Sequence, residues 1–186
     1  MRVEVKGVYM KTEYMIRGQI NLVLAALMPK NSIVMKVALH TGLRLSDILC
    51  IKTAQLSKSR FWVTERKTGK RRQVGLPAAL RAEVLSQAGE IWAFPGRSGK
   101  KPRTRQAVWA DVKRVARALR FPQNIAPHSA RKVYAVRLLE KYGSIARVRR
   151  ELNHSSDSVT VIYALADHMV SQKYPQLDDG HLTGKR

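Results

Sequence analysis

The stretch RFWVTERKTGKRRQVGLP, residues 60–77, differs in pattern from the rest of the chain. RFWVTE is rich in the β-branched and aromatic residues that favour strands, RKTGKRR is a basic run with one glycine, and QVGLP is a second short run. Two strand-like runs joined by a glycine-containing turn predict an antiparallel hairpin. IWAFPG, residues 91–96, is a candidate third strand.

On both sides of this hairpin, apolar residues recur at the spacing of amphipathic helices. Before it, helices are predicted over residues 14–27, from Ser32 to a stop at Gly42, and from an N-cap at Ser46. After it, helices are predicted over residues 104–119, 129–142, 144–152 and 156–166. The expected fold class is therefore mainly α with a small antiparallel β-sheet, an α+β arrangement.

The length of 186 residues and the hydrophobic content of 45% fit one domain with a packed core. We expect that domain over residues 1–167 and a polar tail over residues 168–186, whose ordering depends on a partner. Residues 1–30 lack the pattern of a signal peptide, and no apolar run approaches the ~20 residues of a membrane-spanning helix, so the cytosol is the expected compartment. The single cysteine, Cys50, is expected to be a buried structural thiol, and the tryptophans Trp62, Trp92 and Trp109 to pack in the core or on the hairpin.

The charge is strongly unbalanced, with 35 Lys and Arg against 13 Asp and Glu, a formal net charge of +22. Such a charge favours a polyanionic partner, with nucleic acid the first choice and an anionic membrane surface the weaker one. A solvated face explains any one basic cluster, but three clusters favour contacts with a phosphate backbone, without sequence preference. The residues expected to bind DNA are Arg66, Lys70, Arg71, Arg72, Arg97, Lys100, Lys101, Arg103, Arg105, Arg147, Arg149 and Arg150.

Side chains suited to phosphoryl-transfer chemistry occur in four short motifs. They are Arg44 in HTGLRLSDIL, Lys67 in ERKTGKRR, His128 and Arg131 in APHSARKVYA, and His154 and Tyr163 in LNHSSDSVTVIYALAD. Several of them have plainer explanations: Arg44 as a surface arginine, His128 as a helix cap after Pro127, and His154 as a solvated loop residue. Lys70 is a rival to Lys67, and Tyr134 and Tyr142 are rivals to Tyr163.

These residue types fit cleavage of a phosphodiester without a metal. Arg44 and Arg131 stay charged, and their planar forks match the oxygens of a phosphate that gains negative charge. Tyrosine is a poor nucleophile at its reference pKa of ~10 and needs a base and a positive field. Lys67 can protonate a 5′-oxygen leaving group, and His154 can donate to a nonbridging oxygen. Asp47, one turn after Arg44, is expected to orient that guanidinium.

The same motifs resemble those of the tyrosine recombinases, the integrase family of phages and mobile elements. TGLRLSDIL is similar to the first arginine box, ERKTGK with VGLP to the lysine hairpin, PHSARKVYA to the H-x-x-R box, and LNHSSDSVTVIYA to the box with the second histidine and the tyrosine. The resemblance runs from about residue 33 to 166, and Asn153 stands where the family usually has glycine. Family members usually carry an N-terminal core-binding domain of ~100 residues. Only about 30 residues precede the first box here, so we expect a catalytic domain nearly alone.

The resemblance implies the catalytic-domain fold of that family and a site-specific recombinase that acts on double-stranded DNA. It implies Tyr163 as nucleophile, His128 as its base, a 3′-phosphotyrosyl intermediate, and no metal, ATP or other cofactor. It also implies assembly on DNA as a tetramer and a location at the nucleoid of a bacterium or in a phage context, and an accessory DNA-bending protein is a further candidate partner. Residues 168–186 are expected to dock on a neighbouring protomer, because this polar segment directly follows the helix that carries Tyr163. A type IB topoisomerase-like relaxing activity and a non-catalytic DNA-binding protein are the alternatives.

Overall fold

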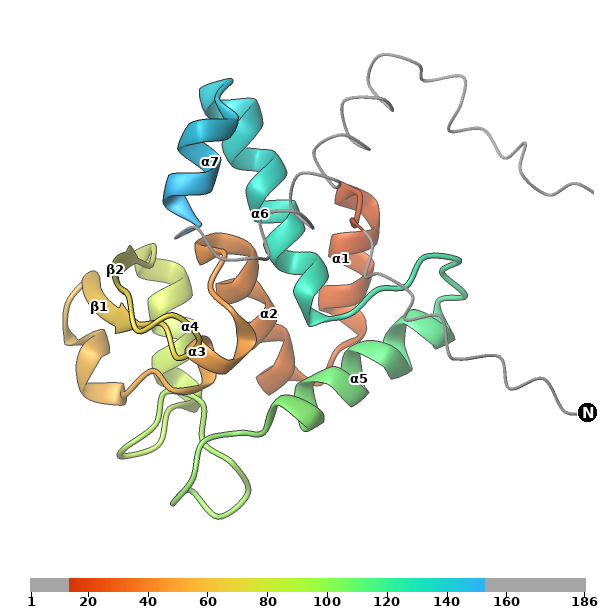
Figure 1. Cartoon of the computed structure of the whole chain (residues 1–186). Coiled ribbons are helices and arrows are strands. Elements are labelled where there is room, and N and C mark those ends of the chain that lie inside the picture. The colour runs from red at the N-terminus through yellow and green to blue at the C-terminus, as the bar shows by residue number, and fades with distance from the viewer. Residues whose placement is uncertain (1–13, 153–186) are drawn as a thin grey trace, which may run out of the picture.

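The computed structural model describes residues 14–152. The predicted helix 156–166, the tail, His154 and Tyr163 lie outside these residues. The elements in order are α1 (Arg17–Ala26), α2 (Pro29–Thr41), α3 (Leu45–Leu49), the 3-10 helix η1 (Thr53–Ser57), β1 (Arg60–Thr64), β2 (Arg71–Gly75), α4 (Ala78–Gln87), α5 (Arg105–Ala118), α6 (Pro127–Tyr142) and α7 (Ile145–Glu151). The predicted class, mainly helical with one small antiparallel sheet, is confirmed (Figure 1).

The predicted hairpin is formed by β1 and β2, which pair antiparallel with Phe61 opposite Val74. Side chains of β1 alternate between solvent and core, so Phe61 and Val63 are buried while their neighbours are exposed. The predicted third strand at 91–96 is wrong, because within residues 14–152 this segment makes only isolated bridges. It folds back on itself instead: the N–H of Gly96 donates to the carbonyl of Lys101 at 2.9 Å.

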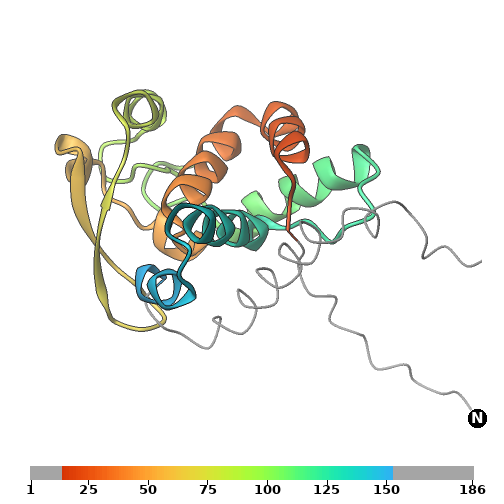
Figure 2. The same cartoon turned by 90° about the horizontal axis from the view of Figure 1, so that it is seen from above.

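Helix α2 forms the centre of the domain. Its side chains Val34, Met35, Val37 and Ala38 are buried, and it contacts α1, α3, α4, α5 and α6. Figures 1 and 2 show α6 running alongside α2, with the hairpin on one side of this pair and α5 crossing below. The loops at the end of α2 and the start of α6 are thereby brought together although they are far apart in the sequence.

Several predicted boundaries differ from the structure. Helix α2 begins at Pro29, which occupies its first position, and not at the predicted Ser32. Ser32 lies inside the helix, where its Oγ donates to the carbonyl of Leu24 at 2.8 Å. The N-cap of α3 is Arg44 and not Ser46, which places the arginine at the mouth of the helix. Helix α4 was not predicted at all, because its sequence AALRAEVLSQ buries only Val84 and so lacks a clear apolar stripe.

Gly42 ends α2 as predicted and has a left-handed backbone, with φ of +62°. A Cβ at this position would overlap the ring of Tyr134 on α6. Glycine is therefore required twice, by its positive φ and by the close approach of the aromatic ring. This contact fixes the distance between the C-terminal end of α2 and the middle of α6.

A buried carboxylate, Asp111 on α5, joins α5 to the start of α2. It is 6% exposed, and its Oδ2 accepts from the backbone N–H of Met28 at 3.0 Å and from Nδ2 of Asn31 at 2.8 Å. Its Oδ1 accepts from Arg114 at 2.6 Å, and Arg103 donates to Asn31 at 3.2 Å. Burial by itself would raise the pKa of Asp111, but these hydrogen bonds and the charge of Arg114 outweigh it, so the pKa is lowered.

We expect Asp111→Asn to lower the free energy of unfolding at pH 7 by about 1–3 kcal/mol, because the bonds to a charged acceptor are weakened. The folded-state pKa of Asp111 is depressed, so its contribution is complete at neutral pH and is lost as the pH falls below about 4. The difference between variant and wild type should therefore shrink in acid. Urea unfolding at pH 7 and pH 3 measures it, with the exposed Glu90→Gln as charge-matched control. A difference that is the same at both pH values would contradict the assignment.

Candidate active site

A cavity of about 510 Å³ opens between the start of α3, the β1–β2 turn, α5 and the start of α6. Four of the predicted catalytic residues line it: Arg44, Lys67, His128 and Arg131. They come from three separate regions of the chain. Their convergence on one cavity is the main feature of the site. His154 and Tyr163 lie outside the described residues.

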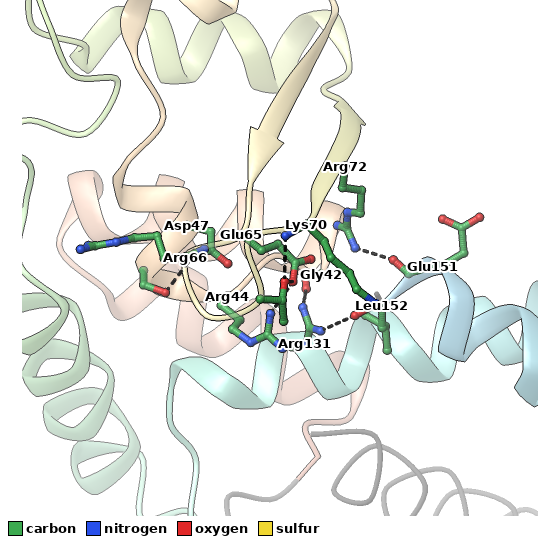
Figure 3. A network of polar contacts seen from close by, with 12 residues as sticks. Gly42, Arg44, Asp47, Glu65, Arg66, Lys70, Arg72, Arg131, Glu151 and Leu152 are labelled. Carbon is green, nitrogen blue, oxygen red and sulfur yellow. Dashed lines mark hydrogen bonds and ion pairs between the residues drawn. The ribbon is translucent and has the colours of Figure 1, made fainter. Parts of the chain in front are cut away.

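Arg131 is held inside the domain at the back of this cavity and is 2% exposed. Its Nη1 donates to the carbonyl of Gly42, and its Nη2 donates to the carbonyl of Leu152 at 2.9 Å (Figure 3). These carbonyls lie at the C-terminal ends of α2 and α7, where helix dipoles favour a cation. His128 is one helical turn earlier on the same face of α6, so both side chains reach the cavity.

Arg44 forms an ion pair with Glu65, at 2.6 Å between Nη1 and Oε2. The Arg44 side chain is 11% exposed and that of Glu65 is 0% exposed. Thr68 in the hairpin turn also donates to Oε2 of Glu65, at 3.2 Å. Our sequence reasoning missed Glu65, although the alternation in β1 carries a signal, because Glu65 follows Phe61 and Val63 on the buried side of the strand.

Asp47 was expected to orient Arg44, but its hydrogen bonds go elsewhere. It is 1% exposed, and its Oδ1 accepts from the backbone N–H of Arg66 at 3.1 Å and from Oγ of Ser46 at 3.3 Å. The hairpin turn brings the Arg66 N–H to this carboxylate, and the carboxylate paired with Arg44 is that of Glu65. Asp47 therefore fixes the turn directly before Lys67.

The two candidate lysines of the turn differ in position. Both side chains are exposed, but Lys67 lines the cavity. Lys70 is the turn residue whose backbone carbonyl accepts from the N–H of Glu65 at 2.9 Å, which closes the hairpin. Proximity to Arg44 and Arg131 therefore favours Lys67.

The alternative that His128 caps α6 is not supported. The N-cap position is occupied by Ala126, whose backbone N–H donates to Oγ of Ser129 at 3.2 Å. His128 lies inside the first turn and is half-buried.

The rival tyrosines, Tyr134 and Tyr142, do not line the cavity. Tyr134 packs against Gly42, and burial raises the pKa of its phenol, although the charge of Arg72 acts in the opposite direction. Tyr142 at the end of α6 lies with its ring 3.8 Å from the guanidinium of Arg147. Both have packing roles within the domain.

Trp109 on α5 forms part of the cavity wall and is 50% exposed, so the expectation that it packs in the core is wrong. Trp62 is also half-exposed, with the guanidinium of Arg71 at 5.1 Å over its ring. Cys50, expected to be buried, is only half-buried, and Nη1 of Arg66 lies 3.7 Å from its Sγ.

The predicted DNA-binding residues divide into two that are bonded within the domain and ten that are exposed. Arg72 and Arg103 are half-buried and bonded within the domain, Arg103 to Asn31 and Arg72 to backbone carbonyls. Arg105 is exposed and lines the cavity. The remaining exposed members are Arg66, Lys70, Arg71, Arg97, Lys100, Lys101, Arg147, Arg149 and Arg150.

No group of three or more His, Cys, Asp or Glu side chains within residues 14–152 is placed to hold a metal ion. None of the helices that the structure describes is long and apolar enough to cross a membrane.

The model of the phage integrase family matches residues 14–169. Curated relatives include the probable integrase/recombinase YoeC of Bacillus subtilis, 28% identical over 67% of this chain and 71% of that protein. The tyrosine recombinase XerD of Rhizobium meliloti is 33% identical over 76% of this chain and 48% of that protein. The integrase of Escherichia phage P2 is 27% identical over 83% of this chain and 43% of that protein.

Solved structures show the same fold. The XerA recombinase has a TM-score of 0.68 at 19% identity, covering 91% of this chain and 66% of that one. A lambda integrase dimer bound to a core site has a TM-score of 0.67 at 18% identity, covering 82% of this chain and 61% of that one. The chain thus spans about half to two thirds of the length of most of these relatives. The match of the family model over residues 14–169, on a fold that gathers both arginine boxes around one cavity, means that this protein belongs to the phage integrase family.

Proposed function

We propose that this protein is a site-specific DNA recombinase that cleaves and rejoins DNA through a covalent 3′-phosphotyrosyl intermediate at Tyr163. The observation that carries the proposal is the convergence of Arg44, Lys67, His128 and Arg131 on one cavity. Two arginines, a lysine and a histidine around a space of about 510 Å³ supply both charge and proton transfer for a phosphodiester.

In the proposed reaction, the phenolic oxygen of Tyr163 attacks the scissile phosphorus and forms a P–O bond. His128 accepts the phenolic proton, which overcomes the high pKa of the tyrosine. The bond to the 5′ oxygen breaks, and Lys67 donates the proton that makes it a 5′ hydroxyl. Arg44, Arg131 and His154 stabilise the negative charge on the nonbridging oxygens. Since one ester replaces another, religation by a 5′ hydroxyl needs neither ATP nor a metal.

The ion pair with Glu65 is proposed to hold the Arg44 guanidinium in the orientation in which it binds the phosphate. Arg44 is 11% exposed, so one edge of its guanidinium is presented to the cavity while Glu65 holds the other side. A guanidinium fixed by a buried carboxylate keeps its orientation when a phosphate arrives, which reduces the reorganisation needed in the transition state. Glu65 is therefore proposed as a positioning residue for Arg44.

Double-stranded DNA is the proposed partner, bound by several copies of the chain. Fold neighbours include a lambda integrase tetramer on a Holliday junction and a XerH recombinase with its palindromic difH substrate. Two cuts on each of two duplexes require several active sites, so we propose a tetramer on DNA, with residues 168–186 docking between protomers and an accessory DNA-bending protein. The exposed basic residues supply the affinity for the backbone.

A nicked suicide duplex tests the proposal. Cleavage beside the nick releases a short 5′-hydroxyl fragment that diffuses away, so the covalent adduct accumulates. We expect the purified full-length chain to form such an adduct with a pool of nicked duplexes of randomised sequence, seen as a labelled band by denaturing electrophoresis. The adduct should form in excess EDTA and without ATP. Protease treatment should eliminate its band, because the attached protein is digested. DNA binding without any adduct across the pool would refute the proposed chemistry.

A further inference from the structure

Arg72, in strand β2, is bonded in a way that its assignment to DNA binding does not explain. Its Nη1 donates to the carbonyl of Glu151 at 2.6 Å, and its Nη2 donates to the carbonyl of Thr41. Glu151 and Thr41 directly precede Leu152 and Gly42, whose carbonyls accept hydrogen bonds from Arg131. Figure 3 shows Arg131 reaching Gly42 and Leu152, and Arg72 reaching Glu151 beside Leu152.

The two arginines thus make a double crosslink. Arg131 comes from α6 and Arg72 from the hairpin, and each guanidinium joins the C-terminal end of α2 to the C-terminal end of α7. Each pair of carbonyls lies where the helix dipole is negative, so a cation is favoured there. Arg72 is the member that attaches the hairpin to this junction.

Arg72 is directed inward by its place in the strand. Along β2, Arg71 and Gln73 are exposed, whereas Arg72 is half-buried and Val74 is buried. Arg71, its neighbour, extends to the other face, where its guanidinium lies over the ring of Trp62. The two adjacent arginines therefore carry the same charge on the same strand but have different surroundings.

The hairpin turn that carries Lys67 is consequently held on both flanks. On the β1 side, Glu65 pairs with Arg44, and Asp47 accepts from the N–H of Arg66. On the β2 side, Arg72 bonds to the helix ends that also hold Arg131. The position of the lysine relative to the two arginines of the cavity is set by both attachments.

We propose that Arg72 is a positioning residue of the reaction, which holds Lys67 at the distance from the scissile phosphate where it can protonate the leaving 5′ oxygen. This inference rests on the proposed function and on Lys67 as the acid. An arginine is required because two N–H groups must reach carbonyls of two different segments, which a lysine ammonium on a flexible stem does poorly. Displacement of a catalytic group by about 1 Å can cost roughly 10²-fold in rate.

The test compares an ordinary suicide duplex with one in which the 5′ bridging oxygen is replaced by sulfur. A thiolate is a far better leaving group than an alkoxide, because the reference pKa of a thiol is only about 8.5, so its departure needs no acid. Arg72→Gln is expected to slow single-turnover cleavage of the oxygen substrate by about 10²-fold and of the sulfur substrate by less than about ten-fold. Lys67→Ala, measured alongside, should show the same selective rescue.

Arg71→Gln is the matched control, since it removes the same charge from the next position. This substitution can change DNA affinity, but the ratio of its cleavage rates on the oxygen and sulfur substrates should equal the ratio of the wild type. Arg72→Lys keeps the charge and should show the altered ratio in weaker form, which preserves the test if Arg72→Gln does not fold by circular dichroism. All rates are measured at saturating DNA.

Equal losses on both substrates in both Arg72 variants, or a ratio like that of Arg71→Gln, would overturn the inference and return Arg72 to a role in binding or stability. A wild-type chain that forms no adduct on either substrate would remove the proposed function and this inference with it.

Discussion

Replacing Tyr163 by phenylalanine is expected to abolish the covalent adduct while DNA affinity remains within about two-fold of the wild type, because one hydroxyl contributes little beside many phosphate contacts. The loss should be complete, since none of the tyrosines within residues 14–152 lines the cavity formed by Arg44, Lys67, His128 and Arg131. Adduct formation on the suicide duplex and binding by a mobility-shift assay are the two measurements.

The rival tyrosines provide the controls. Tyr134→Phe and Tyr142→Phe should both retain the adduct, because Tyr134 packs against Gly42 and Tyr142 against Arg147. If the adduct persists in Tyr163→Phe and disappears in either of the other two, the nucleophile has been assigned to the wrong residue.

Replacing Arg131 by lysine is expected to lower the single-turnover cleavage rate by roughly 10²–10³-fold, the effect of removing one preorganised donor to a developing oxyanion. The ammonium keeps the charge but cannot donate to the carbonyls of Gly42 and Leu152 and also make a two-pronged contact with phosphate. The rate at saturating DNA separates this effect from weaker binding.

Arg137→Lys, an exposed substitution on the same helix, is the matched control and should cleave at the wild-type rate. The melting temperature of both variants should be recorded, because Arg131 is 2% exposed and its replacement also costs stability. Near wild-type cleavage by a folded Arg131→Lys protein would show that charge alone is sufficient at this position.

The hairpin and the grouping of the site residues could be predicted from the sequence because both depend on local patterns. Alternating apolar residues beside a basic glycine turn specify β1 and β2, and the spacing of three in HSAR places His128 and Arg131 on one helix face. The family motifs then indicate which distant segments meet, and the cavity contains the described members of that set.

The features that the sequence did not predict correctly depend on long-range contacts. Helix α4 has almost no buried side chain, so its sequence lacks the stripe that marks a helix, and the segment 91–96 is held by loop hydrogen bonds that its β-prone residues do not reveal. The partner of Arg44 is Glu65, which is 21 residues away, whereas sequence proximity pointed to Asp47. The carbonyls that bind Arg72 and Arg131 leave no trace in the sequence, since every residue has a carbonyl.

The crosslinks at the ends of α2 and α7 also impose an order on the assembly of the site during synthesis. Chains are made from the N-terminus, and a domain folds as a unit once its parts have emerged from the ribosome. The guanidinium of Arg131 needs the carbonyls of Gly42 and Leu152, which are 110 residues apart and lie on either side of it in the order of translation. A nascent chain that ends before Leu152 already carries most of the basic residues proposed to bind DNA, but its Arg131 lacks one of the two carbonyls that hold the guanidinium. The ordering of Arg131 therefore follows its own synthesis and waits for residue 152, whereas Arg44 can pair with Glu65 as soon as the hairpin has been made.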